Sequence, residues 1–214
     1  MIWWPEEIPT LSAANPKAVS KTGGIVTLRS IRPSDSEDVY RSCQDPEIPR
    51  FTTVPSDYPI ELAISFAGER ASASHTNKTE LLFVIESSEL KGTKFRKVLK
   101  DGSLDKNELT SNGFAGVISL HTIDIPNHRA EIGYWIASEA RNRGIGTVAA
   151  EMITEYGLMT MGFRRIDGLA DNSNEGSKKL LLNAGYEYEG LLKKYVTRRD
   201  GSQIDMALFA ATKS

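Results

Sequence analysis

The chain has 214 residues, of which 40% are hydrophobic and 25% charged, with a formal net charge of −2. This length and composition allow a globular core, and the small net charge excludes a general attraction to nucleic acid or membrane. A single cysteine, Cys43, excludes an intramolecular disulfide. No apolar run near the N-terminus has the length of a membrane span. We expect a cytoplasmic protein, monomeric or homodimeric, without nucleic-acid or membrane partners.

Residues 1–22 contain three prolines and the adjacent Trp3 and Trp4. This composition indicates an extension outside the regular fold, followed by one domain over 23–214. Residues 87–112 are polar, with a basic run ahead of an acidic one, and predict an insertion in a loop or hairpin.

Hydrophobic patterning predicts the elements of the domain in chain order. The first half has a strand at 25–31, a helix starting at 33–35 with Ser34 as its cap and Glu37 completing a capping box, a helix at 60–73 and a strand at 80–86. The second half has strands at 114–120 and 129–137, a helix at 148–161, a strand at 165–170, a helix at 174–183, and strands at 186–197 and 203–211. This order predicts a mixed α/β sheet with helices on both faces.

The segment Arg-Asn-Arg-Gly-Ile-Gly-Thr at 141–147 follows an alternating strand and opens a helix. Glycines let the backbone approach a ligand, helix N-terminal amides attract an anion, and arginines add charge, so the segment predicts phosphate binding. One interpretation is a dinucleotide fingerprint, because Gly144, Gly146 and Ala149 fit G-x-G-x-x-A and Asp167 lies near the ribose-binding position. Against it, most of the chain precedes the loop, and residues 138–143 separate strand from glycines.

A second interpretation uses more of the chain. The motifs are Arg141-x-x-Gly144-x-Gly146, Leu28-Arg29-x-x-Arg32-Pro33, Asp45-Pro46-Glu47-Ile48, Gly116-Val117-Ile118-Ser119-Leu120, Arg129 to Ile136, Asp171-x-x-Asn174-x-x-Ser177, and Asn183-Ala184-Gly185-Tyr186-x-x-Glu189-Gly190. In this order they resemble the GCN5-related N-acetyltransferase (GNAT) superfamily, most closely its RimJ/RimL-like branch. The resemblance implies a mostly antiparallel sheet of about seven strands flanked by about four helices.

The resemblance also implies acetyl-CoA as co-substrate and assigns the residues that bind it. The pyrophosphate loop comprises Arg141, Arg143, Gly144, Ile145, Gly146 and Thr147. Asn174 is implied to hydrogen-bond the pantetheine arm. Strand backbone near Trp135 and Ile136 is expected to pair with that arm, where the strands around Ser119 and Trp135 diverge. A side chain at Gly146 is expected to crowd the pyrophosphate.

The implied reaction moves an acetyl group directly to a primary amine of a small molecule or a protein N-terminus. Glu131 stands at the strand position where relatives carry a catalytic glutamate, and strand alternation places it on the same face as Gly133 and Trp135. Partial burial there would raise its pKa toward values useful to a base. Ser177 is expected near the thioester sulfur, where it could donate to the thiolate, because Leu181 occupies the position of a frequent tyrosine acid.

Three alternatives remain open at this point: a nicotinamide-dependent oxidoreductase, a non-catalytic acyl-CoA sensor, and an enzyme using another acyl group. The three histidines, His75, His121 and His128, lack metal-ligand spacing, so we expect no metal. The sequence does not identify the acceptor amine.

Overall fold

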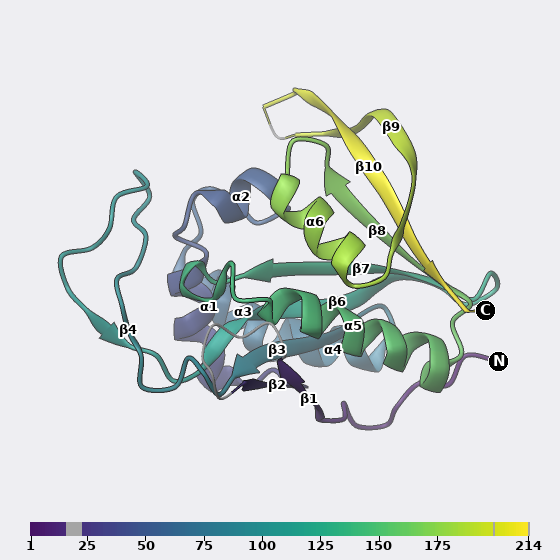
Figure 1. Ribbon diagram of the computed structural model, residues 1–214, viewed down its shortest axis with the longest axis horizontal. Helices are drawn as coiled ribbons and strands as arrows, with labels where there is room; N and C mark the ends of the chain where they lie inside the picture. The colour runs from purple at the N-terminus through teal and green to yellow at the C-terminus, as the bar shows by residue number, and fades with distance from the viewer. Residues whose placement is uncertain (16–22, 199, 214) are drawn as a thin grey trace.

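The computed structural model describes residues 1–15, 23–198 and 200–213. Its main sheet has eight strands in the order β1-β2-β3-β6-β7-β8-β10-β9, and every neighbouring pair is antiparallel except the parallel pair β7–β8 (Figure 1). The strands are β1 Leu11–Asn15, β2 Gly24–Ser30, β3 Leu81–Ser87, β6 Phe114–Asp124, β7 Arg129–Ile136, β8 Arg165–Asp171, β9 Glu187–Thr197 and β10 Gln203–Thr212. A mixed, mostly antiparallel sheet is therefore confirmed, with one strand more than expected.

Helices cover both faces of the sheet. Figure 1 shows α5 and α6 in front of it and α3 and α4 behind it. The α-helices are α1 Ser36–Ser42, α2 Glu47–Phe51, α3 Ile60–Ser65, α4 Ala71–Thr76, α5 Ile145–Glu155 and α6 Glu175–Asn183. Short 3-10 or π turns precede or extend them at η1 Pro33–Asp35, η2 Phe66–Arg70, η3 Ser138–Ala140 and η4 Tyr156–Met161. Within the described residues, none of the helices combines the length and hydropathy that a membrane span requires.

The N-terminal residues depart from the sequence expectation. Leu11–Asn15 forms β1 and pairs with β2, so this part of 1–22 belongs to the sheet. Trp4 is half-buried and packs on His75 with ring centroids 5.7 Å apart, while Trp3 is exposed. Small and polar side chains in β1 give it no alternating apolar pattern, which is why the sequence did not predict this strand. Residues 16–22 lie outside the described part of the chain.

The start of the first helix also differs from the prediction. Ser34 lies inside η1 and is not the cap. The carboxylate of Asp35 accepts the backbone N–H of Arg32 at 2.7 Å and pairs with the guanidinium of Arg29 at 2.8 Å. A buried carboxylate held by an arginine has displaced the weaker hydroxyl cap, because a charged acceptor makes the stronger hydrogen bond.

The polar insertion at 87–112 contains a two-stranded hairpin, β4 Lys94–Phe95 and β5 Leu109–Thr110, as one of the predicted forms. It extends at the left of Figure 1 and is tied to α1. Asn112 donates to Asp38 at 2.7 Å, and the Phe95 ring lies 4.9 Å from the Arg41 guanidinium carbon. The insertion therefore packs on the domain through specific contacts.

The main sheet splits between β7 and β8. The two strands pair from Arg129↔Arg165 to Ile132↔Gly168, and no register pair joins them beyond that point. From there β7 continues along β6 while β8 follows β10, so the two halves of the sheet twist apart (Figure 1). We call the space beyond Ile132 and Gly168 the strand gap.

The gap lies one strand away from its expected place. Ser119 pairs with Gly133 and Val117 with Trp135, so β6 and β7 stay together where the sequence analysis expected them to diverge. The prediction of a divergence next to Trp135 is correct for one side of β7 and wrong for the other. Strands β6 and β7 stay paired because a hairpin turn joins them. Strand β8 follows β7 only after the α5 crossover, so it can separate from β7 along its length.

Candidate active site

The unpaired edge of β7 at the strand gap is provided by Tyr134 and Ile136. Ala137 donates its backbone N–H to Ala115 at 2.9 Å, toward the β6 side. Because consecutive residues of a strand direct their amides to opposite edges, Trp135 also bonds toward β6, and its two neighbours face the gap. The side chain of Trp135 is buried against Phe114, with ring centroids 5.9 Å apart. Trp135 thus supports the strand, and the backbone edge comes from its neighbours.

The glycine loop leads from β7 into α5. Asn142 and Gly144 both have left-handed backbones, with φ of 60° and 73°, and no side chain caps the helix at Gly144. The first-turn amides of a helix have no intrahelical acceptors, so this uncapped end presents amide donors together with the positive end of the helix dipole. Ile145 and Thr147 are buried, so any contact that they make with a ligand has to come from their backbone.

Gly146 has a packing role that the sequence analysis did not foresee. A Cβ atom at this position would lie 2.8 Å from Leu180 Cδ1 and 3.0 Å from Ile136 Cδ1. The glycine therefore allows α5 to approach α6 and the end of β7 closely. A side chain at position 146 would clash with Leu180 and Ile136 of the protein itself. The sequence analysis expected it to clash with the bound phosphate.

The two arginines of the loop are held by protein groups. Arg141 pairs with the buried carboxylate of Asp45 at 2.7 Å and donates its Nε to the carbonyl of Ile136 at 3.0 Å. Arg143 donates its Nε to the carbonyl of Glu139 at 3.0 Å. Arg141 thus fixes the end of β7 to the turn between α1 and α2. Its contact with a phosphate stays a prediction.

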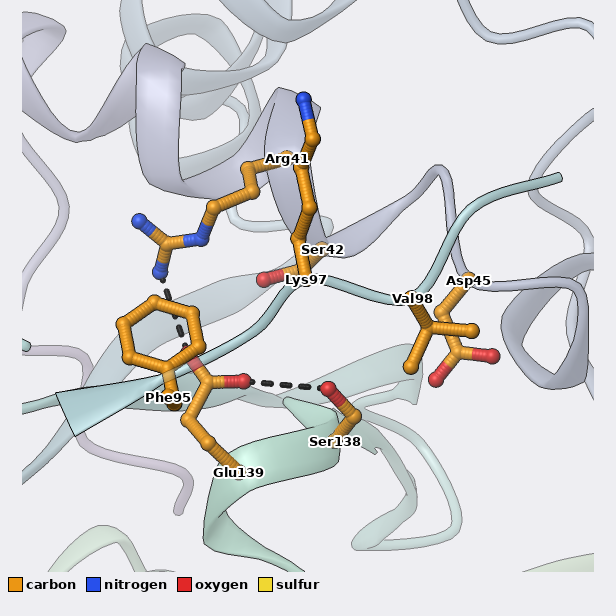
Figure 2. Close-up of a pocket in the computed structure, with 8 residues that line it drawn as sticks. All are labelled: Arg41, Ser42, Asp45, Phe95, Lys97, Val98, Ser138 and Glu139. Carbon is orange, nitrogen blue, oxygen red and sulfur yellow. Dashed lines mark hydrogen bonds and ion pairs between the residues drawn. The ribbon is translucent and has the colours of Figure 1, made fainter. Parts of the chain in front are cut away.

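A small pocket beside the loop shows how the preceding turn η3 is anchored. Figure 2 shows Glu139 between Arg41 of α1 and Ser138, with Phe95 of the insertion beside Arg41. The Arg41–Glu139 ion pair is 3.2 Å long, and Ser138 donates to Glu139 at 3.2 Å. Helix α1 and the insertion therefore hold the base of the glycine loop.

A pair of hydroxyl groups joins β7 to α6 beside the strand gap. Asn174 caps α6, and its Oδ1 accepts the backbone N–H of Ser177 at 3.0 Å. The Ser177 hydroxyl lies 2.8 Å from the Tyr134 hydroxyl. Burial raises the pKa of the Tyr134 phenol, and the Ser177 hydrogen bond only partly offsets this, so the phenol stays protonated at neutral pH. Leu181 is buried in the core.

Sequence reasoning missed Tyr134, although a signal was present. Alternation in β7 places Tyr134 on the face of Ile132 and Ile136, which is the face that α6 covers. A polar tip on this otherwise apolar row needs a hydrogen-bond partner. The available partner, Ser177, is 43 residues away in sequence, and only the tertiary fold brings the two together.

Glu131 lies on the opposite face of the sheet, one step before the gap opens. In the register of the sheet, Glu131 stands opposite His121 on β6 and opposite Asp167 on β8. Burial raises the pKa of Glu131, the charge of His121 opposes this rise, Asp167 adds to it, and Arg129 opposes it. A partly buried carboxyl with a raised pKa is suited to accept a proton.

The arrangement thus places two kinds of proton chemistry at one opening in the sheet. The Ser177 and Tyr134 hydroxyls lie on one face, and the Glu131 carboxyl lies on the other. A donor threaded into the gap from the helix side would meet an acceptor approaching from the Glu131 side. Among the described residues, no group of His, Cys, Asp and Glu side chains is arranged to hold a metal ion.

Comparisons with known proteins agree with this geometry. A family profile described as the acetyltransferase (GNAT) domain matches residues 26–187. The chain is 27% identical over 186 residues to the uncharacterised N-acetyltransferase YoaA of Bacillus subtilis, covering 87% of this chain and 92% of YoaA. Its fold is similar to that of RimJ of Mycobacterium smegmatis in complex with CoA-disulfide, with a TM-score of 0.69, 23% identity, and coverage of 98% and 90% of the two chains. It is also similar to the microcin C7 self-immunity acetyltransferase MccE in complex with acetyl-CoA and AMP, with a TM-score of 0.68, 23% identity, and coverage of 88% and 92%.

Proposed function

We propose an acetyl-CoA-dependent N-acetyl transfer for this chain, which belongs to the acetyltransferase (GNAT) domain family. The observation that carries the proposal is the strand gap, with an unpaired edge of β7 between the uncapped start of α5 and the Tyr134–Ser177 hydroxyl pair. An extended arm that carries amide groups can pair with such an edge as another strand would. The solved complexes of MccE and RimJ contain acetyl-CoA or a CoA derivative.

Each part of the co-substrate then has a defined place. The pyrophosphate lies at the amides of Gly144, Ile145, Gly146 and Thr147, where the dipole of α5 favours negative charge. The pantetheine arm runs along the edge of Tyr134 and Ile136 and passes Asn174. The thioester sulfur reaches Ser177. Acetyl-CoA supplies the activated acyl group, and no metal takes part in the proposed steps.

The residues on either face of the gap carry the proton transfers. An ammonium is not a nucleophile, so Glu131 accepts a proton from it, directly or through water. The amine nitrogen then attacks the thioester carbon and forms a C–N bond. The C–S bond breaks, and the hydroxyl of Ser177 donates a hydrogen bond to the departing thiolate. Tyr134 supports Ser177 from behind, since their oxygens are 2.8 Å apart.

The acceptor is a primary amine of a small molecule or a protein N-terminus, and the reaction is placed in the cytoplasm. The observations favour this function over a nicotinamide-dependent oxidoreductase, because the glycine loop follows a strand of a mostly antiparallel sheet, and the described residues form no doubly wound parallel sheet. A non-catalytic acyl-CoA sensor would have the same gap but would need neither Glu131 nor Ser177.

The test combines ligand binding with turnover. Acetyl-CoA should raise the melting temperature of the protein, and NADH should not. An amine panel with thiol-release detection, followed by mass spectrometry, should give a product heavier by one acetyl group. Stabilisation by NADH alone would reject the proposal. Stabilisation by acetyl-CoA without turnover on any amine would favour the sensor.

A further inference from the structure

His121 lies beside the proposed reaction site, and the proposed mechanism has not used it. It stands directly opposite Glu131 in the β6–β7 ladder, on the same face of the sheet. Its ring leans over Gly133, because a Cβ atom at 133 would lie 2.5 Å from His121 Nε2 and 2.8 Å from its Cδ2. Gly133 is the first residue of β7 beyond the last pair with β8. The imidazole nitrogen is therefore placed over the point where the strand gap opens.

The backbone beside His121 is arranged to hold this ring. Thr122 has a left-handed backbone with φ of 50°, which is unfavourable for a β-branched residue, and the register of β6 shifts between His121 and Asp124. The Thr122 hydroxyl lies 2.8 Å from His121 Nδ1. Bulges and strained residues of this kind are found where a side chain must be aimed. Fixing Nδ1 leaves Nε2 directed toward Gly133.

We propose that His121 is a further catalytic residue, which shares with Glu131 the proton released by the acceptor amine. The inference rests on the proposed acetyl transfer and assigns the final position of that proton. Nε2 is the final acceptor of the proton that leaves the ammonium by way of Glu131 or water, and the Glu131 carboxylate opposite then balances the charge of the imidazolium. A neutral imidazole has the proton affinity that a base near pH 7 needs, whereas a carboxyl must rely on burial to approach it.

The protons and electron pairs of the step balance. The ammonium loses one proton to His121, and its freed electron pair forms the C–N bond to the thioester carbon. The C–S bond breaks, and its electron pair leaves on sulfur. The thiolate becomes a thiol with the proton that the nitrogen still carries in excess, passed through the hydroxyl of Ser177. The imidazolium returns its proton to water before the next turnover.

Charged groups lie on the strands on both sides of His121. Glu131 and Arg129 stand on β7, with Asp167 next to them on β8. On the other side of β6, Glu80 precedes Leu81, the partner of Leu120, and pairs with Arg70 at 4.0 Å. With the imidazole as base, turnover falls at acid pH, because protonation removes the electron pair that accepts the proton.

The first test replaces His121 by Gln and measures turnover against pH in the full chain. We expect His121→Gln to lower turnover roughly 10²-fold, at the lower end of the range for general base catalysis because Glu131 remains. The acidic limb of its pH–rate profile should move to lower pH, because the Glu131 carboxyl is then the base whose protonation limits turnover. His128→Gln is the matched control, because His128 lies in the same hairpin and its ring contacts the carbonyl of Gly162 at 3.3 Å.

The second test uses Gly133, where alanine would displace the ring. Gly133→Ala should lower turnover nearly as much as His121→Ala, since the next nearest atom to the new Cβ, Ser119 Oγ, lies at an ordinary 3.7 Å. The double variant should be no slower than His121→Ala alone, because no ring is left to displace. A melting curve of each variant checks that it is folded.

The outcomes separate this inference from the proposed function. Acetyl transfer by the wild type, with an acidic limb in His121→Gln like that of the wild type, would overturn the role of His121 and leave the acetyltransferase standing. The role of His121 would also be overturned if the loss of turnover in the double variant equalled the product of the losses in Gly133→Ala and His121→Ala. Absence of transfer in a wild type that binds acetyl-CoA would overturn the proposed function, and this inference with it.

Discussion

Replacing Tyr134 by Phe removes one oxygen atom from the end of the strand gap and tests how the leaving thiolate is stabilised. The phenol lies 2.8 Å from Ser177 Oγ, and its pKa is raised by burial, so it remains a hydrogen-bond donor at working pH. A free thiol has a pKa of about 8.5, well below that of a phenol, so full transfer of the Tyr134 proton to the thiolate is unfavourable. We therefore expect Tyr134 to act through Ser177 by hydrogen bonding.

The expected magnitudes follow from this order of contacts. A neutral hydrogen bond contributes about 0.5–1.5 kcal/mol, so Tyr134→Phe should slow turnover roughly two- to tenfold. Ser177→Ala removes the group facing the developing charge and should cost roughly 10²–10³-fold, as for one oxyanion-hole donor. The double variant should be no slower than Ser177→Ala, because Tyr134 then has nothing to support.

The assay follows thiol release at saturating acetyl-CoA and again with an acetyl donor whose leaving thiol is more acidic. Both single losses should shrink with the second donor, because a more stable thiolate needs less help. Tyr186→Phe is the matched control, since its buried hydroxyl lies 2.6 Å from Thr154 Oγ1, a similar pair outside the gap. It should lower the melting temperature and leave turnover unchanged.

Two results would refute the reasoning about the hydroxyl pair. If Tyr134→Phe were slower than Ser177→Ala, the phenol itself would be the group facing the sulfur. If both losses were equal for the two donors, neither hydroxyl would meet the thiolate, and the pair would only join β7 to α6.

Two further predictions concern Glu131 and Gly146. Because burial raises the pKa of Glu131, the fold favours its protonated form and loses stability as the pH rises through that pKa. Glu131→Gln should therefore melt higher than the wild type above that pH, bind acetyl-CoA normally by calorimetry, and lose roughly 10²–10⁴ in turnover; a variant that keeps its turnover would move the base elsewhere. Gly146→Val should lower stability by about 1–3 kcal/mol in denaturant unfolding, because its Cβ would lie 2.8 Å from Leu180 Cδ1, and unchanged stability would contradict this packing.

Local patterns allowed most of the sheet to be predicted. The apolar runs of β3 and β6 and the alternation in β7 depend on nearest neighbours in sequence, and the structure has strands at these positions. Strand β1 was missed because Leu11 is its only large apolar residue, so its place in the sheet depends on pairing with β2. Ser34 was a plausible cap until the guanidinium of Arg29 fixed Asp35 in its place.

In the candidate site, too, features set by consecutive residues could be predicted, and features set by tertiary contacts could not. The glycine loop before α5 could be located from the sequence because its residues are consecutive, and its phosphate binding stays a prediction. The side of β7 on which the gap opens depends on where β8 separates from β7, and the sequence of β7 does not indicate that point. The Tyr134–Ser177 pair and the position of His121 over Gly133 are tertiary contacts, visible only when strand register is known. Sequence reasoning thus supplied the parts of the site, and the fold supplied their arrangement.

The strand gap has a consequence that can be measured residue by residue. Backbone amides of a strand that are shielded from water are nearly always paired, and the edge of Tyr134 and Ile136 has no register partner on β8. The carbonyl of Ile136 already accepts Arg141 Nε at 3.0 Å, whereas Trp135 directs its amide toward β6. If the pantetheine arm pairs with this edge, acetyl-CoA should slow amide hydrogen exchange at Tyr134 and Ile136 much more than at Trp135. Equal protection of all three amides would indicate a general rigidification, and no protection would place the arm outside the gap.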